Sequence, residues 1–228
     1  IAPNNTLTLT FTNKAAKEMQ ERAFAMINPT SYPPLLCTFH KFGLLFLKFN
    51  IHLLGRLNNF VVIDTDDKKR ILKKINAELP LPLIASEISR YKNSLITPGQ
   101  AYAQAELKNY KQIAKIYEEY EAYLLENNLV DFDDLLVQTA FLLLDWPEVR
   151  EQLSNRFKYL LVDEYQDTND LNEEITALLL KDGNLFAVGD DWQSIYSFRM
   201  SNVGHFLAFE KTYPDARIFR LERNYRSA

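Results

Sequence analysis

Five short apolar runs in this 228-residue chain end in polar residues, and this pattern constrains the fold more than any other feature. Each run is compact, and most are followed by a polar residue or a glycine that starts a turn. Segments with helical periodicity separate the runs, so we expect strands of a parallel sheet that is buried on both faces. The predicted strands are Leu7–Phe11, Leu35–Thr38, Tyr159–Val162, Leu185–Val188 and Arg217–Leu221.

The polar residues that end these runs indicate where a ligand would bind. In open parallel α/β sheets, ligands bind at the carboxyl ends of the strands. We therefore expect the functional site along this edge of the sheet. The polar clusters are Thr12–Lys14, His40–Lys41, Asp163–Glu164, Gly189–Asp191 and Glu222–Asn224.

A long segment between the second and third predicted strands reads as almost wholly helical. Pro98 suits the first turn of a helix, and apolar residues repeat at spacings of three and four from Ala101 to Leu125. Another helical run starts near Asp131 and stops at Trp146–Pro147. We predict an α/β core, residues 1–57 and 157–228, with an α-helical subdomain, residues 58–156, inserted in it.

Composition places the chain among ordinary globular proteins, with 47% hydrophobic and 25% charged residues. The net charge of −4 does not exclude DNA, because a local groove can be basic on an acidic protein. The single cysteine, Cys37, rules out an intramolecular disulfide and fits a reducing compartment. The apolar stretch Phe42–Leu54 is too short and polar to span a bilayer. We expect a cytoplasmic protein without membrane association.

Two adjacent carboxylates, Asp163 and Glu164, follow the apolar run Tyr159–Val162. This is what a nucleoside triphosphatase needs, since one carboxylate can hold Mg²⁺ while its neighbour orients and deprotonates the attacking water. We assign Asp163 to the metal and Glu164 to the general base. An isolated Asp-Glu pair is more often a solvated turn, but the Tyr-Gln-Asp-Thr-Asn that follows favours the site.

The segment Asp163–Asn169 closely resembles motif II of the UvrD/Rep/PcrA branch of superfamily 1 helicases, and further motifs follow in family order. The resemblance spans nearly the whole chain. It implies a RecA-like P-loop NTPase core that uses ATP and Mg²⁺. It also implies single-stranded DNA and its junctions with duplex DNA as partners, movement in the 3′-to-5′ direction, duplex unwinding, and a role in repair or replication.

The segment Val188–Arg199 resembles motif III of the same family. Its amide, Gln193, would lie next to the carboxylates, where it can contact a γ-phosphate oxygen and the attacking water without adding charge. The resemblance implies that Phe198 stacks on a DNA base and that Arg199 contacts the strand. Tyr196 either faces DNA or packs in the core.

Motif III also departs from the usual family pattern. Phe198 stands where the family usually has tryptophan, and Met200–Ser201 stands where it has Gly-Ala. The run Asp-Asp-Trp-Gln is also similar to the helicase IV subgroup, so the subfamily stays open.

The segment Leu9–Arg22 resembles motif Ia. The resemblance implies that Phe11 stacks on a base while Thr12 and Asn13 touch the DNA backbone. Taken alone, Phe11 would be a strand residue, and Thr12 or Asn13 would cap the following helix, whose free amides attract phosphate.

Three other segments complete the resemblance. Cys37–Phe42 makes His40 a candidate contact to the DNA backbone, although a lone histidine at a strand end is often structural. Leu221–Ser227 resembles motif IV, which implies that Tyr225 stacks on the adenine and Arg226 reaches the γ-phosphate. Asp131–Leu135 resembles the segment where the insert returns to the core, and we interpret it as a structural helix start.

The phosphate-binding loop, Gly-x-x-x-x-Gly-Lys followed by Ser or Thr, does not occur in the chain. In the family this loop lies shortly before motif Ia, and two later motifs are absent as well. We therefore expect this chain to be a portion of a longer helicase and not to hydrolyse ATP by itself.

Two alternatives remain open at this point. A non-catalytic single-stranded DNA-binding module derived from a helicase would keep Phe11 and Phe198 but tolerate loss of Glu164 and Gln193. A metal-dependent nuclease would leave the tyrosine and arginine of motif IV without a role. The nuclease would use Asp163, Glu164, Asp167, Asp190 and Asp191.

Overall fold

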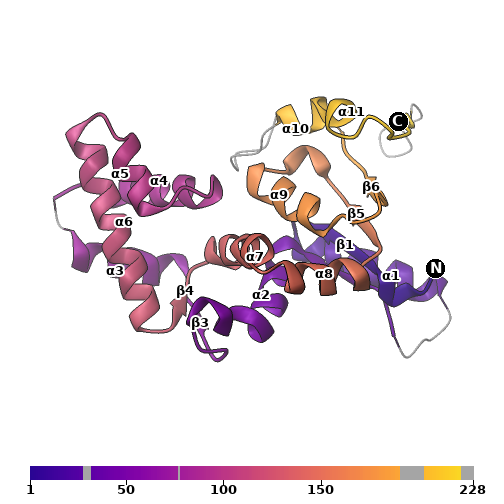
Figure 1. Ribbon diagram of the computed structural model, residues 1–228, viewed down its shortest axis with the longest axis horizontal. Helices are drawn as coiled ribbons and strands as arrows, with labels where there is room; N and C mark the ends of the chain where they lie inside the picture. Colours follow the sequence, from indigo (N-terminus) through magenta and orange to yellow (C-terminus); the bar gives the residue numbers. More distant parts are fainter. Residues whose placement is uncertain (28–31, 77, 191–202, 222–228) are drawn as a thin grey trace.

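The computed structural model describes residues 1–27, 32–76, 78–190 and 203–221. Its centre is a four-stranded parallel sheet in the order β2-β1-β5-β6 (Figure 1). This arrangement, flanked by helices, confirms the predicted α/β fold class with a parallel sheet. The strands are β1 (Thr6–Thr10), β2 (Leu35–Thr38), β5 (Tyr159–Val162) and β6 (Leu185–Ala187).

The fifth predicted strand, Arg217–Leu221, is wrong, because these residues form no strand. Phe219 is 82% exposed and Leu221 is 95% exposed, so the apolar side chains of this run are not buried in the described structure. An apolar run becomes a strand only when a neighbouring strand accepts its backbone hydrogen bonds. None of the strands in the described ranges pairs with this run.

Helices and short 3₁₀ turns surround the sheet, and polar side chains cap several of them. Thr12, Thr38 and Asn169 each accept a hydrogen bond from a backbone amide in the first turn of the helix that follows. The α-helices are α1 (Asn13–Met26), α2 (Phe39–Asn50), α7 (Asp134–Asp145), α8 (Pro147–Arg156), α9 (Asp170–Leu179), α10 (Val203–Leu207) and α11 (Phe209–Thr212). The 3₁₀ turns are η1 (Pro3–Asn5), η2 (Ile51–Leu54) and η3 (Tyr165–Asp167).

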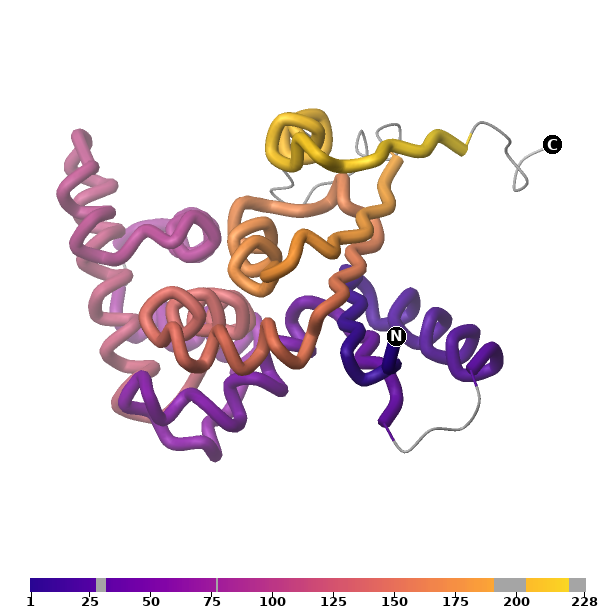
Figure 2. The backbone as a smooth tube through the Cα atoms, turned by 45° about the vertical axis from the view of Figure 1, so that its right-hand side comes forward, coloured from indigo at the N-terminus to yellow at the C-terminus, as the bar shows by residue number. Residues whose placement is uncertain are grey.

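A separate helical part lies at one end of the molecule, away from the sheet (Figure 1 and Figure 2). It begins and ends at two short parallel strands and has its own buried cluster, which includes Leu72, Ile113 and Tyr120. Its elements are β3 (Val61–Val62), α3 (Thr65–Ile75), α4 (Leu81–Asn93), α5 (Pro98–Gln104), α6 (Lys108–Glu126) and β4 (Leu129–Val130). None of the helices within the described ranges is long and apolar enough to cross a membrane.

The helical stretch from Ala101 to Leu125 is divided into α5 and α6, which meet at a break over residues 105–107. Pro98 opens α5 as predicted, behind a capping box made by Thr97 and Gln100. Helices α7 and α8 contribute Leu135 and Val149 to the buried cluster that also contains the sheet. The domain limits at residues 57 and 156 stay a prediction.

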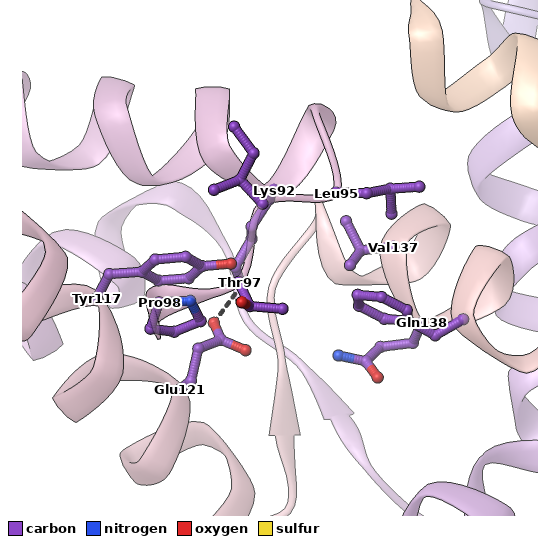
Figure 3. Close-up of a pocket in the computed structure, with 10 residues that line it drawn as sticks. Lys92, Leu95, Thr97, Pro98, Tyr117, Glu121, Val137 and Gln138 are labelled. Atoms are coloured by element: carbon purple, nitrogen blue, oxygen red, sulfur yellow. Dashed lines mark ion pairs between the residues drawn. The ribbon is translucent and has the colours of Figure 1, made fainter. Parts of the chain in front are cut away.

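A buried group of opposite charges joins the helical part to α7. Lys92 of α4 is 1% exposed, and its Nζ lies 2.7 Å from Asp134 Oδ1 and 3.1 Å from Asp131 Oδ2. Lys68 of α3 also lies 3.0 Å from Asp131, and Glu121 of α6 lies 2.7 Å from Lys92 beside a pocket between α4, α6 and α7 (Figure 3). Four helices therefore meet at one set of ion pairs.

Burial and mutual charge shift the titration of this group. Burial opposes the charge of Lys92, but the carboxylates of Asp131 and Asp134 outweigh it and raise the pKa of the ammonium well above its ordinary value. Burial also acts against ionised Asp131, yet Lys92 and Lys68 bring the pKa of that carboxyl below its usual range. Burial, followed by the negative charge of Asp131, raises the pKa of Asp134 to about 7.

We predict that Lys92→Met destabilises the protein strongly, because it leaves the buried carboxylate of Asp134 without its cation. Removing one partner of a buried ion pair costs about 3–5 kcal/mol. Urea unfolding measures this loss, and Lys73→Met on the exposed face of α3 is the matched control. Lys92 acts to lower the pKa of Asp134, so Lys92→Met raises this pKa further above about 7. Stability then falls with rising pH over a wider range in the variant than in the unmodified protein, so the loss is larger at about pH 8 than at about pH 5. Equal stability of Lys92→Met and Lys73→Met would contradict this role.

Helices α2 and α7 approach so closely at Gly43 that no side chain fits between them. A Cβ on Gly43 would lie 2.3 Å from the carbonyl oxygen of Leu135 and 3.1 Å from Thr139 Oγ1. Backbone atoms cannot move aside as a flexible side chain can. Glycine is therefore required here for packing.

We predict that Gly43→Ala lowers the free energy of unfolding by about 1–3 kcal/mol or more, because the two helices must separate. Gly99→Ala in α5 is the control, since a Cβ there meets nothing within 4 Å, and it is expected to be neutral or slightly stabilising. Thermal unfolding of both variants compares them. Similar stability of the two would show that the α2–α7 contact adapts to a larger residue.

Candidate functional site

The acidic pair lies at the carboxyl edge of the sheet, directly after β5. The backbone N–H of Asp163 donates to the carbonyl of Leu9 in β1 at 3.0 Å. The hydroxyl of Thr10, the last residue of β1, donates a long hydrogen bond of 3.5 Å to Asp163 Oδ2. The pairing of β1 with β5 therefore holds Asp163 between the ends of two neighbouring strands.

Glu164 has an unusual backbone for a residue other than glycine. Its φ of 53° and ψ of 45° lie in the left-handed region, which is sparsely populated for residues with a Cβ. The chain then enters the turn η3, where the N–H of Asp167 donates to the carbonyl of Glu164 at 2.8 Å.

The acidic pair fits a divalent cation that arrives with a phosphate ligand. Partial burial, and then the negative charge of Glu164, raises the pKa of the Asp163 carboxyl. The hydrogen-bond partners of the two side chains, Thr10 and Gln166, are both neutral. Mg²⁺ is commonly held by one or two carboxylates together with phosphate and water, which suits Asp163. Across the described ranges, no group of three or more His, Cys, Asp or Glu could form a complete metal cage.

The residues that follow β6 contact the turn η3, which comes directly after Asp163 and Glu164 and is called the acidic turn below. The N–H of Tyr165 donates to the carbonyl of Val188 at 2.8 Å, and the N–H of Asp190 donates to Gln166 Oε1 at 3.0 Å. The next residues in the chain belong to the predicted motif III. Asp191, Gln193, Tyr196, Phe198 and Arg199, like Tyr225 and Arg226 of the predicted motif IV, lie outside the described residues.

The predicted DNA-facing residues of motif Ia follow β1 at the same edge. Phe11 is partly buried, and its ring packs against Phe39 with 5.3 Å between the centroids. Thr12 confirms the predicted cap, since its hydroxyl accepts from the N–H of Ala15 at 3.1 Å. Thr12 and Asn13 are both exposed at the start of α1. Their contact with DNA stays a prediction.

His40 follows β2 and stacks on an aromatic residue from a distant segment. Its ring lies 3.9 Å from that of Phe132, with the planes at 13°. Phe132 is 59% exposed, although its neighbour Asp131 and nearby Asp134 are buried. Sequence reasoning took this segment as structural and missed Phe132. The signal in the sequence was an aromatic residue between two acidic residues. Local periodicity cannot distinguish such an exposed aromatic residue from one in the core.

The fold and the site together define a class. A parallel α/β sheet that delivers adjacent carboxylates to its carboxyl edge has the architecture of a nucleoside triphosphatase core. The protein-family model described as "UvrD/REP helicase N-terminal domain" matches residues 1–214. The chain therefore belongs to the UvrD/Rep helicase family.

Curated relatives agree with this assignment. The chain is 37% identical over 235 aligned residues to the ATP-dependent DNA helicase PcrA of Staphylococcus aureus strain Mu50, with 100% of the chain and 32% of the relative covered. It is 38% identical to the ATP-dependent DNA helicase Rep of Buchnera aphidicola, with 99% of the chain and 36% of the relative covered. The chain thus spans about a third of the length of these relatives.

Proposed function

We propose that this chain is part of an ATP-dependent DNA helicase that moves along single-stranded DNA and unwinds duplexes. One observation carries the proposal: Asp163 and Glu164 end β5 at the same edge of the sheet where Phe11 follows β1 and His40 follows β2. The names of its PcrA and Rep relatives support the same function. A cytoplasmic role in repair or replication, movement from 3′ to 5′ and action at duplex junctions belong to this proposal.

In the proposed reaction, the side chains at the end of β5 prepare water for attack on the γ-phosphorus of ATP. Asp163 would hold Mg²⁺, and the ion would supply positive charge against the phosphate oxygens. Glu164 accepts the proton of the attacking water as the water oxygen bonds to the γ-phosphorus and the bond to ADP breaks. Gln193, Tyr225 and Arg226 are the proposed contacts to the γ-phosphate and the adenine.

The proposed DNA track crosses the ends of β1 and β2. Exposed aromatic rings are good platforms for unpaired bases, each worth about 1–3 kcal/mol. Phe132, held in place by the ring of His40, joins Phe11 as a proposed platform. The free backbone N–H groups at the start of α1, near Thr12 and Asn13, are suited to bind a phosphate of the DNA backbone. Tyr196, Phe198 and Arg199 are proposed to continue the track.

The two alternatives are less well supported. A metal-dependent nuclease would leave Tyr225 and Arg226 of the predicted motif IV without a role. A non-catalytic DNA-binding module would tolerate the loss of Glu164 and Gln193, and the chain has both residues.

We predict that Glu164→Gln, made in the full-length protein, lowers DNA-stimulated ATP hydrolysis by about 100-fold or more, because the water loses its proton acceptor. Binding of ATP should persist, since the amide has the same shape. Glu148→Gln, an exposed change on α8, is the control. Hydrolysis by the Glu164 variant at the unmodified rate would remove this residue from the mechanism.

We predict that Phe132→Ala weakens binding of a single-stranded oligonucleotide by about 5- to 100-fold, because one stacked base is lost. Fluorescence anisotropy of a labelled oligonucleotide measures the affinity. Phe49→Ala is the matched control, because Phe49 is also exposed, at 75%, but lies near the far end of α2. If the two variants bind equally well, Phe132 is not part of the track.

A further inference from the structure

Gln166 is a buried polar residue whose side-chain amide connects the carboxylate of Glu164 to the backbone of Asp190. The residue is 1% exposed. Its Nε2 donates to Glu164 Oε2 at 2.6 Å, and its Oε1 accepts from the N–H of Asp190 at 3.0 Å. A carboxylate can only accept and a backbone N–H can only donate, so these two partners determine which way the amide points.

The surroundings hold this amide tightly. A Cβ added to Gly189 would lie 2.8 Å from Gln166 Oε1 and 2.6 Å from the ring of Phe206. Glycine at this position therefore lets the end of β6 approach the amide. The turn itself is anchored by the hydroxyl of Thr168, which is fully buried and donates to the carbonyl of Tyr165 at 2.7 Å. Gln166 thus has little freedom to move.

Glu164, in contrast, is a partly exposed side chain with several rotatable bonds. A general base is effective only when its carboxylate is aimed at the water from which it takes the proton. The hydrogen bond from Gln166 holds Oε2 and leaves Oε1 able to face a water molecule. The same amide also ties this carboxylate to Asp190, directly before the segment with Gln193.

We propose that Gln166 is the positioning residue of the general base: its amide aims the carboxylate of Glu164 and links it to the backbone at the end of β6. This inference rests on the proposed ATP hydrolysis. It requires an amide, because a carboxylate at the same place would put an oxygen against Glu164 Oε2 where an N–H now donates.

The test compares Gln166→Glu with Gln112→Glu in the full-length protein. Gln112 also donates to a carboxylate, Glu78 Oε2 at 3.1 Å, but on the exposed surface of the helical part. DNA-stimulated ATP hydrolysis is measured over a range of ATP concentrations. We expect Gln166→Glu to lower kcat by about 10- to 100-fold and to leave KM within about twofold. Gln112→Glu should match the unmodified protein.

Two further variants separate positioning from a general structural effect. Gln166→Met removes both hydrogen bonds without adding charge and is expected to lower kcat by about tenfold. In a Glu164→Gln background, Gln166→Glu should lower kcat by less than a further factor of about two, because the carboxylate that Gln166 positions is already gone.

Three results would overturn the inference: kcat of both Gln166 variants within twofold of the unmodified protein, a rise in KM that matches the fall in kcat, or an equal loss in the Glu164→Gln background. If the unmodified full-length protein hydrolyses no ATP, the proposed function itself fails and this inference falls with it.

Discussion

The parallel pairing of β1 with β5 is the contact on which the rest of the site depends. It aligns Leu9 with Val162, residues that are far apart in the chain. Because parallel strands end at the same edge, the pairing brings the residues after β1 and those after β5 together. β2 and β6 extend the edge on either side. A candidate DNA surface and a candidate phosphate site thereby become neighbours in one rigid sheet.

The helical part is connected to this edge through polar side chains as well as through the chain itself. Asn169, which caps α9 after the acidic turn, donates to Asn93 Oδ1 at 3.1 Å. Asn93 in turn donates to Asp133 Oδ1 at 3.1 Å, next to the buried ion pairs of Lys92. These partly buried hydrogen bonds require specific geometry. The segment that follows Asp163 and Glu164 is therefore in contact, through Asn169, with α4 of the helical part.

Much of the fold could be predicted from local sequence, and the failures have a common cause. Four strands lie within about a residue of their predicted ends, because buried parallel strands are short apolar runs with clear stops. The run Arg217–Leu221 looked the same but pairs with no described strand, and pairing is not a local property. Phe132 and Gln166 were missed for a similar reason. Their proposed roles rest on contacts with His40 and with the end of β6, which only the folded chain brings close.

A crystal structure of the full-length protein with Mg²⁺, a non-hydrolysable ATP analogue and a single-stranded oligonucleotide would test the proposed sites for nucleotide and DNA. We expect the γ-phosphate and the metal beside Asp163 and Glu164, with bases across Phe11 and Phe132 at the ends of β1 and β2. Nucleotide bound away from the end of β5, or DNA on another face of the sheet, would contradict it.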